Sequence, residues 1–214
     1  MTVTKSARGH PLFARYYARV SPLLDRGLVA YRTALLADLS GEVIEIGAGT
    51  GSNFAHYPLT ARRVLAVEPE SHLRRPARAA AARAPVPIEI VAGVAEHLPA
   101  ADESFDAAVL SLVLCTVPDQ TAALAEIVRV LRPGGQLRIF EHVRADTPVR
   151  RRVQRALDAT LWPRVVGGCR TCRDTVAAVR EAGFEIERLD RLGPGDTGMP
   201  FPIAPQVLCW AVRR

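Results

Sequence analysis

Long apolar runs are absent from this sequence. The two longest stretches without a charged residue, 46–61 and 197–212, are interrupted by glycine and proline and are shorter than the roughly 18–20 apolar residues that a membrane-spanning helix needs. The first residues, MTVTKSARGHPLFARYY, contain no apolar core of about 7–15 residues of the kind found in secretory signals. We therefore expect no membrane span, no export and a cytoplasmic location.

Lysine is also nearly absent, since Lys5 is the only lysine among 28 basic residues. The formal net charge is +6, and residues 144–173 carry all of it, with eight arginines against two aspartates. Aromatic residues make up only 6% of the chain and are not interleaved with the basic ones, as a surface for single-stranded nucleic acid requires. We therefore expect no nucleic-acid partner.

Cysteines are few, and no secretory signal accompanies them, which favours reduced thiols in a reducing compartment. Cys169 and Cys172 form a C-x-x-C motif. A second cysteine pair at zinc-knuckle spacing is missing, and the motif does not follow the first strand of a βαβ unit as a thioredoxin-like motif does. We therefore expect no metal site. The alternatives are that both cysteines only pack in the protein or that Cys169 lines a pocket.

What the sequence does contain is a repeated alternation of strand-like and helical segments, with 49% hydrophobic residues in 214, enough for one domain with a full core. Predicted strands occupy 42–46, 63–67, 88–92, 105–112, 135–143, 184–189 and 206–212, and the clearest helix occupies 118–131. Several of the first five strands are largely apolar on both faces, and a Gly/Pro-rich loop joins the last two. The pattern predicts an α/β fold with a doubly wound, mostly parallel seven-stranded sheet and an antiparallel C-terminal edge hairpin.

The sharpest local signal is a glycine-rich loop after the first predicted strand. Residues 43–54 read VIEIGAGTGSNF, in which a strand is followed by three glycines and then a helix. Such a loop lets the backbone approach a nucleotide closely, although glycines also serve tight turns. The next strand ends at Glu68, whose carboxylate can accept both ribose hydroxyls of an adenosine bound at the carboxyl edge of the sheet.

The glycine spacing separates two cofactor classes. Dinucleotide-binding loops read G-x-G-x-x-G/A, and Ser52 occupies the last position of that pattern. The glycines instead fall at Gly47, Gly49 and Gly51, and this G-x-G-x-G pattern resembles that of class I S-adenosylmethionine-dependent methyltransferases. An NAD-dependent oxidoreductase remains the remote alternative.

The motif order over about 41–143 resembles the type 11 domain of that methyltransferase family. VAGVAEHLP at 91–99 and DESFD at 102–106 resemble the segment after its third strand, and LRPGG at 131–135 resembles its turn into the fifth strand. The resemblance implies a Rossmann-like methyltransferase fold and S-adenosyl-L-methionine as cofactor. The candidate cofactor-binding residues are Glu45, Gly47, Ala48, Gly49, Gly51, Asn53, Glu68, Pro69, Val94, Ala95, Glu96, Leu112 and Cys115.

A narrower resemblance covers the second half of the chain. SLVLCTV at 111–117, FEHV at 140–143, GC at 168–169 and RDT at 173–175 resemble the alkyl-thiol S-methyltransferases of the methyltransferase-like seven group. That group has a cysteine in place of Ala48, and an N-terminal membrane segment that we do not expect here. The resemblance implies S-methylation of a small hydrophobic thiol, with Glu141, His142 and Cys169 as candidate catalytic residues. For Glu141 and His142, a hydrogen-bonded strand end is the alternative.

Other functions stay open at this point. Within methyl transfer, they are carbon, oxygen or nitrogen methylation of a quinone-like or natural-product acceptor, and outside catalysis an adenosine-binding module. We expect one methyltransferase domain over 1–214, consisting of an N-terminal helical segment (1–40), a cofactor-binding core (41–143) and an acceptor-side segment with the C-terminal hairpin (144–214). Residues 12–39 and 149–168 are amphipathic, and we expect them either to close the acceptor pocket or, for the second, to form a solvated surface helix. The oligomeric state stays open.

Overall fold

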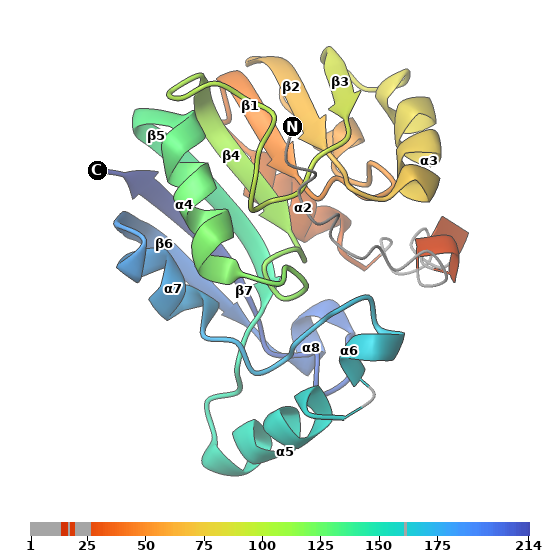
Figure 1. Cartoon of the computed structure of the whole chain (residues 1–214), viewed down its shortest axis with the longest axis vertical. Coiled ribbons are helices and arrows are strands. Elements are labelled where there is room, and N and C mark those ends of the chain that lie inside the picture. The colour runs from red at the N-terminus through yellow and green to blue at the C-terminus, as the bar shows by residue number, and fades with distance from the viewer. Residues whose placement is uncertain (1–13, 17, 20–26, 161) are drawn as a thin grey trace, which may run out of the picture.

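A seven-stranded mixed sheet forms the middle layer of the protein (Figure 1). The computed structural model describes residues 14–16, 18–19, 27–160 and 162–214. The strands are β1 (Gly41–Ile46), β2 (Ala61–Val67), β3 (Ile88–Val91), β4 (Phe105–Ser111), β5 (Leu131–His142), β6 (Phe184–Leu192) and β7 (Gln206–Arg213). Their order across the sheet is β3-β2-β1-β4-β5-β7-β6. The first five strands pair in parallel, which confirms the expected doubly wound fold.

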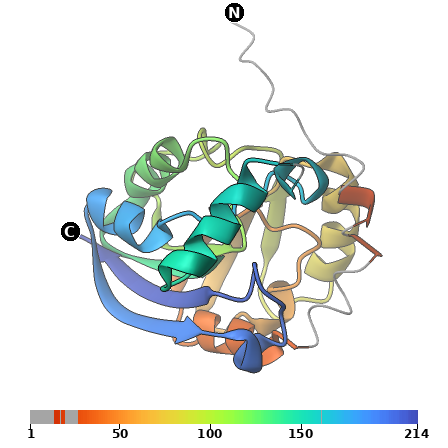
Figure 2. The same cartoon turned by 90° about the horizontal axis from the view of Figure 1, so that it is seen from below.

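Helices cover both faces of this sheet, as the view onto its edge shows (Figure 2). They are α2 (Val29–Leu36), the short 3-10 helix η1 (Phe54–His56), α3 (Ser71–Ala81), α4 (Gln120–Val130), α5 (Pro148–Asp158), α6 (Trp162–Val165), α7 (Thr175–Glu181) and α8 (Pro194–Thr197). One core lies between the sheet and α4 with α7, and the other between the sheet and α2 with α3. Both faces of β1 are therefore buried over its last four residues, which explains the apolar Val43, Ile44 and Ile46.

The C-terminal hairpin is present, and its second strand lies inside the sheet. β7 pairs antiparallel with both β5 and β6, so β6 is the edge strand. The burial of the two strands matches this order, because the first six residues of β7 are buried whereas β6 is largely exposed or half-buried. No helix among the described residues is long and apolar enough to cross a membrane.

Helix α5 turns a different face inward from the one that its sequence suggests. Val149 and Val153, on the expected apolar face, are 67% and 43% exposed, whereas Gln154 is fully buried. The Gln154 amide accepts a hydrogen bond from the Ala145 N–H at 2.7 Å and donates to the carbonyl oxygens of Val143 and Pro202. This polar anchor holds α5 beyond the carboxyl ends of the parallel strands (Figure 1).

Candidate active site

The glycine-rich loop has the geometry of a close backbone approach. Gly47, Gly49 and Gly51 have φ angles of 69°, 58° and 84°, in the left-handed region that favours glycine. A Cβ atom on Gly47 would lie 2.5 Å from the side chain of Val113, and one on Gly51 would lie 2.6 Å from the ring of Phe54. The loop therefore has no room for side chains at these two positions, and its backbone stays close to the turn that follows β4.

Glu68 lies directly against this loop. The side chain is 4% exposed, and its two carboxylate oxygens accept hydrogen bonds of 2.8 Å from the backbone N–H groups of Gly49 and Glu70. Burial raises the pKa of Glu68, and these two N–H groups lower it. Each carboxylate oxygen keeps a free lone pair, so the group can also accept hydroxyl donors from a bound ribose. The two parts of the predicted nucleotide site are thus adjacent in space.

Glu45 and Asn53 support the loop from inside the protein. The Glu45 carboxylate is buried and accepts hydrogen bonds from the Asn53 amide at 3.0 Å and from the Tyr57 hydroxyl at 2.6 Å. The Asn53 carbonyl oxygen accepts a hydrogen bond of 2.7 Å from the Arg32 guanidinium. Burial raises the pKa of Glu45 to about 7 despite these donors. Sequence reasoning missed Arg32 and Tyr57, because neither belongs to a motif.

The segment after β3 lies at the same sheet edge, because β3 pairs in register with β2. Ala95 is buried, the Glu96 carboxylate accepts a hydrogen bond of 3.3 Å from the Asp119 N–H, and Val94 bridges to His97. Pro69 follows Glu68, and its carbonyl oxygen accepts a hydrogen bond from Arg74.

The chain turns sharply after β4. Leu112 has a φ angle of 60°, which is rare for a residue with a side chain, and its N–H donates a 2.7 Å hydrogen bond to the carbonyl oxygen of Phe140 in β5. Backbone strain of this kind clusters at functional sites. The turn directs the chain from the end of β4 toward the end of β5.

The carboxylate of Glu141 holds this turn. One oxygen accepts hydrogen bonds from the N–H groups of Val113 and Leu114 at 2.8 Å and 2.5 Å, and the other accepts one of 3.1 Å from the N–H of His142. The side chain is fully buried. These hydrogen bonds are those of a strand-end carboxylate, the alternative given above for this position, and Glu141 stays a candidate catalytic residue.

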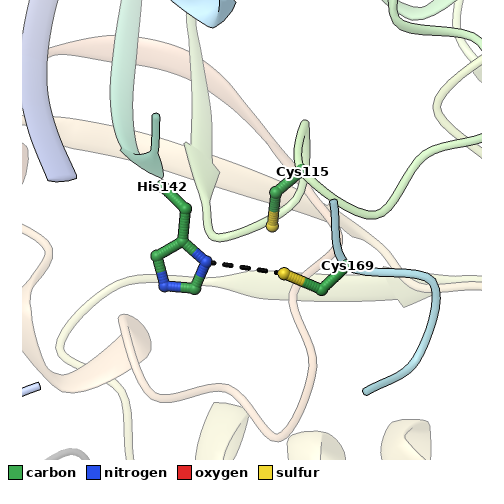
Figure 3. A group of neighbouring side chains, drawn as sticks. All are labelled: Cys115, His142 and Cys169. Atoms are coloured by element: carbon green, nitrogen blue, oxygen red, sulfur yellow. Dashed lines mark hydrogen bonds between the residues drawn. The ribbon is translucent and has the colours of Figure 1, made fainter. Parts of the chain in front are cut away.

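Three soft side chains meet beside this turn (Figure 3). The Cys169 sulfur lies 3.7 Å from His142 Nδ1, and the ligating atoms of Cys115, His142 and Cys169 all lie within 4.8 Å of one another. All three residues are buried. The N–H of Arg170 donates a 2.8 Å hydrogen bond to the Cys115 carbonyl oxygen, which ties the two cysteine-bearing segments together.

The C-x-x-C motif is divided between two environments. Cys169 joins the cluster with Cys115 and His142, whereas the Cys172 thiol donates a hydrogen bond of 3.6 Å to the carbonyl oxygen of Arg151 in α5. The expectation of no metal site considered only cysteine spacing along the chain. The fold brings the other donors from the ends of β4 and β5.

Comparison with known proteins identifies the family. A model described as a methyltransferase domain matches residues 44–139. Mouse thiol S-methyltransferase TMT1B is 34% identical over 186 residues, which cover 83% of this chain and 74% of the mouse protein. The chain is a class I S-adenosylmethionine-dependent methyltransferase.

Two further proteins are similar to this methyltransferase. Demethylmenaquinone methyltransferase of Thermobifida fusca is 41% identical over 106 residues, which cover 48% of this chain and 44% of that protein. The crystal structure of a S-adenosylmethionine-dependent methyltransferase from Thermotoga maritima superposes with a TM-score of 0.70, covers 94% of this chain and 98% of its own, and is 23% identical. That last likeness concerns the fold.

S-adenosylmethionine is the cofactor of this methyltransferase, and the site fits it. The crowded glycine loop, the carboxylate of Glu68 and the turn at Leu112 lie together at the carboxyl ends of β1, β2 and β4. Open α/β sheets bind their ligands at this edge. The segment 12–39, expected to close the acceptor pocket, lies partly outside the described residues, and its described part includes α2, whose Leu35 and Leu36 are buried.

The cluster of this methyltransferase polarises its two thiols. A hydrogen bond from Cys115 lowers the pKa of the Cys169 thiol below its usual range, and His142 and Trp162 lower it further. The same hydrogen bond, together with burial, raises the pKa of Cys115. The pKa values of the two thiols are therefore shifted in opposite directions.

Proposed function

We propose that this methyltransferase transfers its methyl group to the sulfur of a small hydrophobic thiol. The observation that carries the proposal is the pair of thiols and the imidazole at the ends of β4 and β5, beside a carboxylate, that of Glu141, whose two oxygens are both bound by backbone N–H groups. A thiol suits such a site, because it ionises without a strong base. The similarity to thiol S-methyltransferase TMT1B, which extends over 74% of that protein, supports the same acceptor.

Methyl transfer from a sulfonium is an in-line displacement, so the protein must hold the acceptor, the methyl group and the cofactor sulfur nearly collinear and free of water. When bound, S-adenosylmethionine supplies a methyl group on a positively charged sulfur. The glycine loop and Glu68 hold that cofactor at the sheet edge. A free thiol has a pKa of about 8.5, so about a tenth is ionised at slightly alkaline pH and its proton can pass to water.

The candidate catalytic residues take different parts in this proposal. His142 and Cys169 border the reacting sulfur. Glu141 acts as a positioning residue, because its carboxylate fixes both the turn that leads to Cys115 and the backbone of His142. The described parts of the two amphipathic segments, 12–39 and 149–168, shape the acceptor pocket beside the core at 41–143.

A second candidate is carbon methylation of a quinone-like acceptor. The demethylmenaquinone methyltransferase of Thermobifida fusca favours it, but that similarity covers 48% of the chain. The thiol proposal is preferred because the mouse relative also matches beyond the cofactor-binding half, over 83% of the chain.

The test is methyl transfer from labelled S-adenosylmethionine to matched thiols, alcohols, phenols and quinones. We expect turnover on small aliphatic and aromatic thiols to exceed turnover on the matched alcohols and phenols, because a phenol with a pKa near about 10 needs more help from a base. Cys172→Ser, outside the cluster, should keep most of the activity. Efficient methylation of quinones or phenols with every thiol untouched would overturn the thiol acceptor, and no transfer with the cofactor bound would favour a binding module.

A further inference from the structure

We propose that Cys115, His142 and Cys169 bind a zinc ion with one open coordination position. The open coordination position would take the acceptor thiol, and this part of the inference rests on the proposed function. The ion-binding part rests on the geometry of the three side chains alone.

The spacing of the donor atoms fits a tetrahedral ion. Zinc binds sulfur at about 2.3 Å and imidazole nitrogen at about 2.0–2.1 Å, which places neighbouring donors roughly 3.5–3.8 Å apart. The Cys169 sulfur and His142 Nδ1 are already 3.7 Å apart, and the set lies within 4.8 Å. In Figure 3 both sulfur atoms and the imidazole point toward one shared space. Bringing all three donor atoms from within 4.8 Å of one another to tetrahedral spacing requires about 1 Å of side-chain movement.

The backbone around the cluster is held in place before any ion binds. The Arg170 N–H donates to the Cys115 carbonyl oxygen, so the two cysteine-bearing segments are bound directly to each other. The Arg173 guanidinium donates to the carbonyl oxygens of Leu114 and Val117, which flank Cys115. Glu141 fixes the other side of the same turn and the backbone of His142. Outer partners of this kind orient the ligands of metal sites.

The donor set selects a soft divalent ion. Two thiolates and an imidazole favour zinc over magnesium or calcium, which prefer oxygen ligands. The nearby carboxylate of Glu141 is engaged by backbone N–H groups, and Cys172 donates its thiol to Arg151. Three protein ligands with a fourth position open is the arrangement of catalytic zinc, whereas structural zinc has four.

The second ring nitrogen of His142 bears on its role as a ligand. His142 is 8% exposed, and its Nε2 atom has no hydrogen-bond partner among the described residues. Coordination through Nδ1 leaves Nε2 as an N–H donor, and ligating histidines normally donate that hydrogen bond to an acceptor. The acceptor must therefore come from a bound molecule or from water.

A zinc ion at this position would serve methyl transfer to sulfur. The incoming thiol releases its proton to water and binds the ion as a thiolate. Its sulfur then forms a bond to the methyl carbon while the bond from that carbon to the cofactor sulfur breaks. The products are a methyl thioether, S-adenosylhomocysteine and the released proton. The neutral thioether is a weaker ligand than the thiolate and leaves the open position.

Cobalt binding tests the site without reference to activity. The full chain, kept reduced with a phosphine and stripped with a chelator, is titrated with Co²⁺. We expect one equivalent to give the intense visible absorption of tetrahedral cobalt with a thiolate charge-transfer band, and zinc to displace it. Cys115→Ser, Cys169→Ser and His142→Gln should each weaken binding at least tenfold, whereas Cys172→Ser should not. Circular dichroism and a cooperative urea transition for each variant show that it is folded.

The outcomes separate the two proposals. No tetrahedral cobalt spectrum, or one that is lost in Cys172→Ser and kept in Cys115→Ser and Cys169→Ser, overturns the zinc site. Adding a small thiol should change the visible cobalt spectrum, and an unchanged spectrum at saturating thiol overturns the open position. Cobalt binding with no thiol methylation would leave the ion site and reject the thiol acceptor. Thiol methylation without cobalt or zinc binding would reject the ion site and leave the thiol acceptor.

Discussion

Glu141 illustrates how one buried side chain can organise the backbone of a site. Its carboxylate accepts hydrogen bonds from three backbone N–H groups. Two belong to Val113 and Leu114, which lie 28 and 27 residues earlier in the chain, and the third belongs to the adjacent His142. A buried carboxylate is costly unless its oxygens are hydrogen-bonded, and here each oxygen has at least one donor. The positions of Cys115 and His142 therefore depend on the hydrogen bonds that Glu141 accepts.

Glu45 provides a test at pH values near neutral. Its pKa is about 7 in the folded protein against 4.5 ordinarily, so the folded state holds this proton more tightly than the unfolded state. The contribution to stability is therefore full below about pH 4.5 and is lost as the pH rises through 7. Relative to Glu45→Gln, the wild-type free energy of unfolding should fall by about 3 kcal/mol from pH 4.5 to 7.5.

Urea unfolding at a series of pH values measures this difference. Tyr57, Arg32 and Glu68 also act on Glu45, and the comparison with the Gln variant isolates the one proton. Glu89→Gln, at an exposed position in β3, serves as the control and should show the wild-type pH dependence. Parallel pH profiles for the wild type and Glu45→Gln would show that Glu45 is ionised throughout.

At the scale of elements, helix α5 should depend on its polar anchor more than on its apolar residues. Gln154→Leu keeps the size of the side chain but leaves the Ala145 N–H and two carbonyl oxygens without their partner. We expect a loss of about 2–3 kcal/mol in the free energy of unfolding. Val149→Gln, at a position 67% exposed, should change it by less than about 0.5 kcal/mol. Equal urea midpoints for the two variants would mean that α5 is held by other contacts.

The sequence was sufficient for the elements whose signal is local. The predicted helix 118–131 is α4, with Leu131 beginning β5 instead, and all seven predicted strands are present. Each of these is encoded by hydrophobic periodicity within one segment. The glycine loop and Glu68 could also be predicted, because motif and strand end lie close in the chain.

Features that depend on distant segments could not be predicted in this way. The inner position of β7 and the inward face of α5 are set by what packs against them, which periodicity does not contain. The residues of the cluster, Cys115, His142 and Cys169, come from three separate segments of the chain, so no spacing rule reveals it. The C-x-x-C spacing left open whether Cys169 lines a pocket or both cysteines only pack, and the structure gives the two thiols different partners.

For the whole molecule, cofactor binding and stability are linked. S-adenosylmethionine at 100 times its Kd should raise the free energy of unfolding by about 2.7 kcal/mol, or the Tm by about 5–10 °C, and NAD should not. Glu68→Gln should weaken binding by about 1.5–3 kcal/mol, since a hydrogen bond to a charged group is lost. At the same cofactor concentration its stabilisation should fall to about 1.4 kcal/mol or less.

Thermal unfolding with and without each cofactor measures these shifts, with each variant compared with its own cofactor-free form. Glu89→Gln is again the matched control. Stabilisation by NAD alone would contradict the cofactor assignment. An unchanged shift in Glu68→Gln would mean that Glu68 only braces the loop through Gly49.

The inner position of β7 has a consequence for how the chain is made. β6 joins the sheet only through β7, so the ribosome delivers β6 before the strand that will pair with it exists. Until β7 pairs with both strands, β5 has an unpaired edge and β6 has no partner strand. An unpaired strand edge is open to pairing with a neighbouring chain.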